Sequence, residues 1–447
     1  MCRIARIHAR EVFDSRGMPT VEAEVTCVAS RPGRAIVPSG ASTGKHESVE
    51  LRDRNDSRLD GKGVARAVEN VRGEIAAALI DMDASDQQKV DAMLCALDGT
   101  ENKGRLGANA LLAVSLATAY AAAEAQGITP VDQLNRVWRK LPGGKTAVKT
   151  TIGASMSIPL PMVNMISGGL HAGGNLDIQD VLILPVGANS FRQGWESVVT
   201  VYRRLGPLLT DAGLEGRLVG DEGGYGPRLK SNEEAIQFVV AAIEAAGFSP
   251  GKQVAIGLDV AASHFFKDGL YRLSSTAGGN LTADGMIDML DDWVQRYPIV
   301  SIEDALAEDD WEGWRRLTDR LGRRVQLIGD DLFVTNRARL ERGIAAGVCN
   351  SVLIKLNQAG TLSETLDTMR LAIDHGYRPV ISARSGETED TTIADLAVAT
   401  GAGQIKVGSA ARSERLAKYN QLLRLEEQLA GRAEYQGGDI FDLLRRD

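Results

Sequence analysis

Short apolar runs that end in a charged residue recur through the second two thirds of the chain. The first of them, VAIGLDV, carries Asp259 near its end. The runs that follow it end in Glu303, Asp330, Lys355, Arg384 and Lys406. From Glu303 onward they are spaced by 22 to 29 residues, with helix-patterned segments such as 363–376 between them. This rhythm is typical of repeated βα units.

The repeated βα units predict an α/β fold with an eight-stranded, TIM-like α/β barrel. In such a barrel the carboxyl ends of the strands gather at one face, so charged residues that close successive strands converge there. One such residue alone is more simply a surface charge at the start of a loop, but six in series favour a shared site. An open doubly wound sheet is the alternative architecture, although no G-x-G-x-x-G motif follows a strand.

The N-terminal part of the chain has a different pattern and predicts an α+β domain that caps the barrel. Its predicted elements are strands at 21–28 and 35–40 and helices at 64–80 and 109–125. A stretch rich in Gly and Thr, at 141–155, is the best candidate for a domain boundary. The sequence therefore predicts a capping domain over 1–145 and a catalytic barrel over 146–447.

Composition narrows the class of protein. With 447 residues, of which 44% are hydrophobic and 25% charged, the chain can bury a large core. A net charge of −8 argues against nucleic acid or an anionic membrane as a partner. No uncharged apolar window of about 18 residues and no secretory signal stand out, so a soluble cytoplasmic protein is expected. The four cysteines lack C-x-x-C spacing, which indicates neither a disulfide framework nor a zinc site.

Three of the charges that close predicted strands are carboxylates, namely Asp259, Glu303 and Asp330. Clustered carboxylates repel one another unless a cation neutralises them, and hard oxygen donors are the ligands that Mg²⁺ prefers. Each of them could instead pair with an arginine or cap a helix. As a set they predict a Mg²⁺ site.

Two lysines, Lys355 and Lys406, close later strands of the same predicted ring. A lysine beside another cation and a metal is expected to have a lowered pKa and to serve as a base, while the other stays charged and binds an anion. A base that faces a metal-bound carboxylate suits abstraction of the proton next to that carboxylate, because the metal stabilises the ene-diolate. The predicted reaction class is therefore proton abstraction α to a carboxylate.

Two glycine-rich stretches add candidate site residues. In GDEGGYGP, Asp221 and Glu222 precede paired glycines, a tight turn that leaves Glu222 free to act as an acid or base. The loop VPSGASTGKHE, at 37–47, contains Ser42 and is of the kind that closes over a phosphate or donates an oxygen to a metal. A plain surface loop is nearly as good a description of it.

The chain resembles the enolase family over nearly its whole length. The motifs that carry the resemblance are FDSRGMPTVEAEV (13–25), VPSGASTG (37–44), GANALLAVSLA (107–117), GDEGG (220–224), SIED (301–304), GDDLFVTN (329–336), IKLNQAGT (354–361), RSGETEDT (384–391) and RSERLAKYNQLLRLEE (412–427). A lysine base with Mg²⁺ at an ene-diolate is that superfamily's own pattern. The resemblance implies a capping domain on an eight-stranded barrel, usually as a homodimer.

The resemblance also implies a role for each candidate residue. Asp259, Glu303 and Asp330 would hold one tightly bound Mg²⁺, and Ser42 would join a second Mg²⁺ that arrives with the substrate. Lys355 would be the base, Glu222 the acid, Lys406 a ligand of the substrate carboxylate, Arg384 and Ser385 the phosphate site, and His171 the active-site loop histidine. The substrate would be a small phosphorylated carboxylate, 2-phosphoglycerate or a close analogue.

Several positions depart from the family's pattern. Ala383 replaces the histidine of SHRSGE, and Asp180 replaces the glutamate of QEFMI, which withdraws that carboxylate by about 1.5 Å. The other departures are Ser167 for asparagine, His264 for glutamate, Ala305 for proline and Val407 for threonine. Loss of an imidazole together with a shortened active-site carboxylate favours a changed reaction over drift, because catalytic geometry tolerates such displacements poorly.

Three functions follow as hypotheses. The favoured one is a repurposed paralogue that resembles carboxyphosphonoenolpyruvate synthase of phosphonate and phosphinate natural-product biosynthesis, with a phosphonoformyl nucleotide as second substrate. The first alternative is an ordinary glycolytic phosphopyruvate hydratase, which converts 2-phosphoglycerate to phosphoenolpyruvate and water. The second is a catalytically silent enolase-like binding protein, against which the retained acids and lysines argue.

Overall fold

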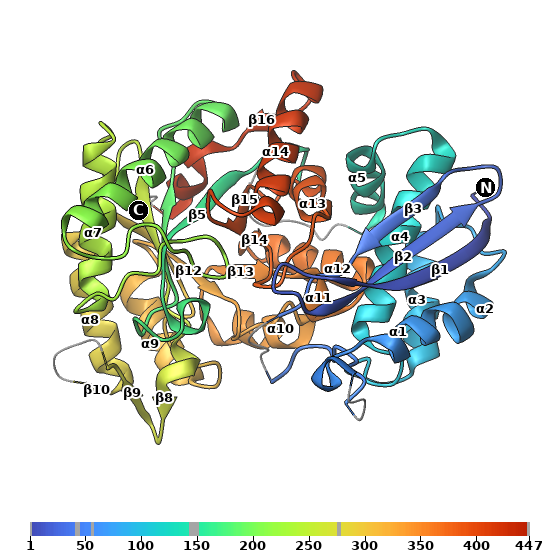
Figure 1. The fold of residues 1–447 in the computed structure, drawn as a ribbon, viewed down its shortest axis with the longest axis horizontal. Helices are drawn as coiled ribbons and strands as arrows, with labels where there is room; N and C mark the ends of the chain where they lie inside the picture. The colour runs from blue at the N-terminus through green and yellow to red at the C-terminus, as the bar shows by residue number, and fades with distance from the viewer. Residues whose placement is uncertain (1, 41–44, 55–57, 143–151, 275–278, 445–447) are drawn as a thin grey trace.

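The computed structural model describes residues 2–40, 45–54, 58–142, 152–274 and 279–444. It contains an N-terminal α+β domain and, beside it, a larger α/β barrel (Figure 1). The predicted boundary between residues 145 and 146 lies outside the described residues. So does Ser42, the residue predicted to join a second Mg²⁺.

The N-terminal domain is a three-stranded antiparallel sheet covered by helices. Its strands are β1 (Ile4–Phe13), β2 (Pro19–Cys27) and β3 (Pro32–Ile36), in that order across the sheet. The sequence prediction missed β1 and began the last strand three residues late. The long helix α4 (Ala108–Gln126) packs on β2 and β3 so closely that a Cβ at Gly33 would lie 2.0 Å from the backbone nitrogen of Ala121. Small residues on both surfaces make this approach possible.

Helix α4 is also long and apolar enough to cross a membrane by length and composition. The sequence analysis did not single out this segment, which contains the charged residue Glu124. However, 83% of the apolar window is buried inside the protein, as expected for the core helix of an α+β domain.

The barrel is closed by eight strands in the order β11-β12-β13-β14-β15-β5-β6-β7. The strands are β5 (Leu160–Ser167), β6 (Asp180–Leu184), β7 (Ala255–Asp259), β11 (Ile299–Glu303), β12 (Gln326–Gly329), β13 (Ser351–Ile354), β14 (Arg378–Ser382) and β15 (Gln404–Gly408). They are almost entirely buried, and apolar residues dominate them, as expected for strands covered on both faces. The predicted fold class is confirmed.

One strand differs from a regular (β/α)₈ barrel. Strand β6 runs antiparallel to both of its neighbours, β5 and β7. Its first residue, Asp180, therefore pairs in register with Asp259, the last residue of β7. Because of this reversal, the beginning of β6 lies at the same face as the carboxyl ends of the other strands.

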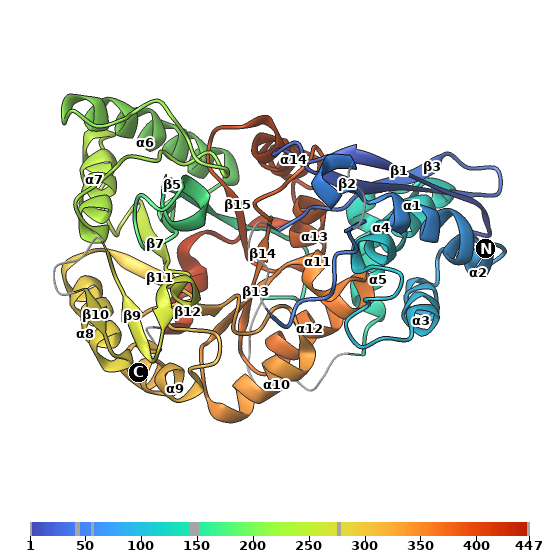
Figure 2. The same ribbon diagram turned by 60° about the horizontal axis from the view of Figure 1, so that its bottom comes forward.

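Helices surround the barrel strands (Figure 2). Two of them, α6 (Phe191–Asp211) and α7 (Asn232–Ala245), lie in sequence between β6 and β7. The others are α8 (Ala283–Arg296), α9 (Trp311–Leu321), α10 (Arg337–Ala346), α11 (Leu356–Ala359), α12 (Leu362–Asp374), α13 (Thr392–Thr400) and α14 (Ser413–Gln428). A small antiparallel sheet of β8 (Phe266–Lys267), β9 (Leu270–Arg272) and β10 (Asn280–Leu281) follows β7.

The two domains meet beside β14. Helix α5 (Pro130–Lys140) of the N-terminal domain packs against α13. Ser39, which follows β3, exchanges two backbone hydrogen bonds of 2.9 Å with Gly386, which follows β14. The N-terminal domain is thus attached directly to the turn that contains Arg384 and Ser385.

Candidate active site

The three predicted metal carboxylates lie together at the carboxyl face of the barrel. Asp259 and Glu303 end the adjacent strands β7 and β11 and pair in register, and Asp330 follows β12 directly. All three are at most 7% exposed. Burial of so many like charges requires cations or hydrogen-bond donors nearby.

The two predicted lysines neutralise these carboxylates. The Nζ of Lys406 lies 2.6 Å from Oδ2 of Asp259 and 2.8 Å from Oε2 of Glu303. The Nζ of Lys355 donates a hydrogen bond to Oδ2 of Asp330. The nearest charged neighbours of each lysine are therefore carboxylates, not other cations.

These contacts oppose the lowered pKa that is expected of a lysine of the ring beside a bound metal. Burial lowers the pKa of Lys355. The Asp330 carboxylate and other nearby acids more than offset this effect, so the net pKa lies above its usual value. Burial is likewise outweighed at Lys406, where Asp259 and Glu303 raise the pKa. The lowered pKa stays a prediction for the site with its metal bound.

The site has the donors that a hard cation needs. Beside Asp259, Gln179 donates a hydrogen bond of 3.1 Å to the carboxylate, while its own buried Oε1 has no hydrogen-bond partner among the residues that the structure describes. A second group of acids, Asp304, Asp330 and Asp331, brings one carboxylate oxygen from each residue within 4.8 Å of the others. Oxygen-only donors with a buried acceptor left over fit Mg²⁺.

Sequence reasoning missed Asp304 and Asp331, although each follows a predicted metal ligand in the motifs SIED and GDD. Asp304 is buried and accepts hydrogen bonds of 2.9 and 2.8 Å from the backbone nitrogens of Asp330 and Asp331. Burial, followed by the two neighbouring aspartates, raises the pKa of Asp304 well above its usual value. This side chain fixes the turn that presents Asp330.

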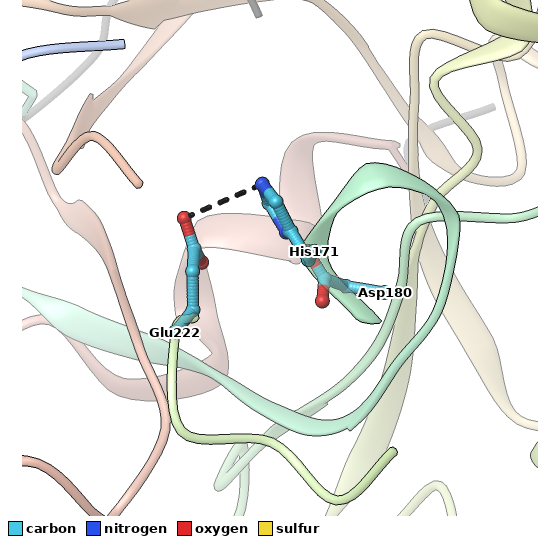
Figure 3. A group of neighbouring side chains, drawn as sticks. All are labelled: His171, Asp180 and Glu222. Carbon is cyan, nitrogen blue, oxygen red and sulfur yellow. Dashed lines mark hydrogen bonds and ion pairs between the residues drawn. The ribbon is translucent and has the colours of Figure 1, made fainter. Parts of the chain in front are cut away.

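A second cluster consists of His171, Asp180 and Glu222 (Figure 3). The Nδ1 of His171 lies 3.0 Å from Oδ2 of Asp180, and its Nε2 lies 3.8 Å from Oε1 of Glu222. His171 belongs to a short 3₁₀ turn between β5 and β6, Asp180 begins β6, and Glu222 comes from the loop between α6 and α7. Three separate segments thus bring these predicted residues together.

The predicted phosphate site already holds one of the protein's own carboxylates. Arg384 donates hydrogen bonds of 2.9 and 3.3 Å to the two oxygens of Glu47, and a third of 2.7 Å to Asn357. The hydroxyl of Ser385 accepts a hydrogen bond of 3.4 Å from Arg16 of the N-terminal domain. Two-point contact with a carboxylate is the geometry that an arginine also uses for phosphate. The sequence prediction did not include Glu47.

A fully buried arginine, Arg415 of α14, holds this turn in place through hydrogen bonds to its backbone. Its guanidinium donates hydrogen bonds to the backbone oxygens of Ser385 and Val407, at 2.5 and 3.0 Å, and also to that of Arg384. The residue lies within a motif quoted for the family resemblance, but only the structure explains its role. It couples the predicted anion site to the strand that carries Lys406.

The departures from the family pattern are not scattered. Ala383, Val407 and His264 line one cavity, together with Lys355 and Arg384. Ser167 and Ala305 are fully buried. His46 lies in a separate groove near Asp309. His264 is therefore, of these two histidines, the one that lines the cavity with Ala383.

The fold and the site define an α/β-barrel enzyme with an acidic ring, two lysines and an anion-binding turn at the carboxyl face of its strands. Comparison with family models agrees with this class. The model described as enolase, N-terminal domain, matches residues 4–134, and that described as enolase, C-terminal TIM barrel domain, matches residues 155–443. The chain belongs to the enolase family, and it is an enolase-type lyase.

The contact of Lys406 with two carboxylates predicts a pH-dependent loss of stability when the lysine is removed. Lys406→Met leaves Asp259 and Glu303 buried without their cation, which is expected to cost about 3 kcal/mol of unfolding free energy at pH 8. Burial, followed by Asp259, already raises the pKa of Glu303. In the variant Glu303 takes up a proton as the pH falls, so the loss is smaller at pH 5.

Denaturant unfolding at the two pH values measures both quantities. Arg316→Met, which removes an exposed contact with Asp284, is the matched control and should change stability little. A Lys406→Met variant with wild-type stability at pH 8 would contradict the charge balance described here.

Proposed function

We propose that the protein abstracts the proton α to the carboxylate of 2-phosphoglycerate, or a close analogue, to give an enolpyruvate-type product. The observation that carries this proposal is the convergence of Lys355, Lys406 and Arg384 on one cavity edged by Asp259 and Asp330. A base, an anion site and a group of acids within one cavity are what enolisation of a phosphorylated carboxylate requires.

In this proposal Lys355 removes the proton, Lys406 binds the substrate carboxylate, and Arg384 with Ser385 binds the phosphate. The substrate phosphate displaces Glu47 from Arg384 and takes over its two-point contact. Both lysines must first exchange their present acidic partners, because a lysine that is hydrogen-bonded to a carboxylate is held in its charged form.

Magnesium is the cofactor that we propose. Asp259, Glu303 and Asp330 would hold it, with Gln179 and Asp331 beside them, and a second ion would arrive with the substrate. A bound divalent cation stabilises the negative charge that develops on the substrate carboxylate during enolisation. It would also replace the lysine ammonium groups as the counter-charge of the acids, which would release Lys355 and Lys406 for the substrate.

The step after enolisation is proposed to differ from that of an ordinary hydratase. Ala383 and Val407 place apolar surface in the cavity where the family has polar side chains. His264 lines this cavity and also an outer pocket of about 400 Å³, whose lining includes Leu170, Phe265 and Lys267. Apolar surface with a cation suits a larger anionic second substrate such as a phosphonoformyl nucleotide, as in carboxyphosphonoenolpyruvate synthase.

The second candidate is an ordinary phosphopyruvate hydratase. It is supported by Glu222, which lines the cavity near Lys406, so that an acid is present for departure of a hydroxyl group. A catalytically silent binding protein is the least favoured candidate. Burying so many charges costs free energy, and a protein without metal and substrate chemistry has no need to bear that cost. The homodimer, suggested by the family resemblance, stays a prediction.

Exchange at C2 of 2-phosphoglycerate tests the proposed first step. With Mg²⁺ in deuterium oxide the wild-type protein should replace the C2 proton with deuterium, and Lys355→Ala should lower that rate at least a thousandfold, since the base is lost. NMR of the recovered substrate measures the exchange. Absence of exchange in the wild type, with metal present, would favour the silent binding protein instead.

Back-substitution tests whether the departures redirect the reaction. The double variant Ala383→His with Asp180→Glu restores the family's residues, so it should form phosphoenolpyruvate from 2-phosphoglycerate at least tenfold faster than the wild type. Absorbance of the enol product measures the rate, and Ala383→Gln is a control for added volume without an imidazole. A wild-type rate equal to that of the double variant would support the ordinary hydratase.

A further inference from the structure

We propose that the outer pocket beside the active-site cavity is a separate subsite for a ring-bearing phosphate ester, with the ring against its apolar wall and the phosphate at Lys267. The pocket lies between the turn at 169–177 and the segment at 264–274. The inference rests on the proposed function for the use made of the bound group, since it names the class of second substrate. The binding itself does not depend on the reaction.

The outer pocket adjoins the active-site cavity. His264 lines both of them, and its side chain is exposed. The volume of the outer pocket, about 400 Å³, falls within the range of small-molecule sites. A ligand held there would therefore lie next to a substrate bound at Lys355 and Arg384.

Apolar side chains form one wall of the pocket. Leu170 and Leu176 come from the turn between β5 and β6, and Phe265 comes from the segment after β7. Leu170 is 56% exposed, and Phe266, which begins β8, is 36% exposed. Large apolar side chains exposed beside a pocket indicate a ligand surface, and aromatic rings favour contact with the face or edge of another ring.

The wall that carries Phe265 is held rigidly. The ring of Phe265 packs edge-on against the ring of Tyr271, with the centroids 6.2 Å apart. The buried Tyr271 belongs to the hairpin of β8 and β9 (Figure 1), and its hydroxyl donates a hydrogen bond of 3.1 Å to Asp310. The same hydroxyl accepts one of 3.0 Å from the backbone nitrogen of Ala307. A wall that is fixed in advance lowers the entropy cost of binding.

The charges of the pocket favour an anion. Two cations line it, Lys267 and Arg272, and Arg272 pairs with Asp268 at 2.7 Å. The carboxylate of Asp177 also lines it, but it accepts hydrogen bonds of 2.8 and 2.7 Å from the backbone nitrogen and hydroxyl of Ser274. Within the described part of the chain, the exposed ammonium group of Lys267 has no ion pair. A lysine ammonium is a point charge that suits phosphate.

Calorimetric titration of the full-length protein with phenyl phosphate and with adenosine 5′-monophosphate tests the subsite. Both should bind saturably, and inorganic phosphate should bind at least tenfold more weakly because it has no ring. Comparable affinities would assign the pocket to the ring and phosphate alone, whereas tighter binding of the nucleotide would add the sugar to the recognised group. Prior equilibration with 2-phosphoglycerate and Mg²⁺ should leave this binding in place.

Two variants locate the bound group. Lys267→Glu should weaken binding at least tenfold, since it reverses the charge at the phosphate. Leu170→Ser should weaken it at least threefold through lost apolar contact. Both side chains are exposed, so neither change disturbs the core. Lys252→Glu, an exposed lysine in the loop before β7, is the matched control and should change nothing.

Several results would overturn the subsite. They are absence of saturable binding, equal binding by Lys267→Glu, equally tight binding of inorganic phosphate, and displacement of the ring-bearing phosphate by 2-phosphoglycerate. Self-association that Leu170→Ser abolishes, without any binding of these ligands, would assign the surface to a second copy of the chain.

Exchange at C2 separates this inference from the proposed function. Normal exchange by the wild type without binding of either ring-bearing phosphate overturns the subsite alone. Binding that Lys267→Glu weakens, without exchange in the wild type, supports the subsite and overturns the proposed function.

Discussion

Mutual neutralisation of buried charges at the carboxyl face of the barrel is the constraint on which the rest of the structure depends. Asp259, Glu303 and Asp330 are buried at adjacent strand ends, and their repulsion is offset by Lys406 and Lys355. Removal of charges from water is costly, so a barrel that places five of them together must keep acids and cations in contact. The same contacts hold both lysines in the charged form until other partners replace them.

The reversed direction of β6 brings the cluster of His171, Asp180 and Glu222 to the same face as the acids and lysines. By running antiparallel between β5 and β7, this strand brings Asp180 to the carboxyl face, where it meets His171. Attachment of the N-terminal domain at Gly386 then places Arg16 and Glu47 against the anion-binding turn. The barrel therefore supplies the acids and lysines, while the N-terminal domain completes the surroundings of Arg384.

The sequence predicted the barrel and the ring of charges because both follow from local periodicity, and charged residues at strand ends must converge. It could not predict the orientation of β6, since antiparallel and parallel buried strands have the same apolar pattern. Nor could it predict which acid each lysine contacts, so it left out the Asp330 carboxylate that raises the pKa of Lys355. The pairing of Glu47 with Arg384 joins segments more than 300 residues apart, and no local sequence pattern indicates it.

Calorimetric titration of the protein with Mg²⁺ near pH 7.5 tests most directly the claim that this charge-balanced ring is a cation site. The account predicts one saturable site per chain without substrate, and at least tenfold weaker binding in Glu303→Gln. It also predicts that bound metal raises the midpoint of thermal unfolding in the wild type but not in that variant. Absence of saturable binding, or equal binding by the Glu303→Gln variant, would contradict it.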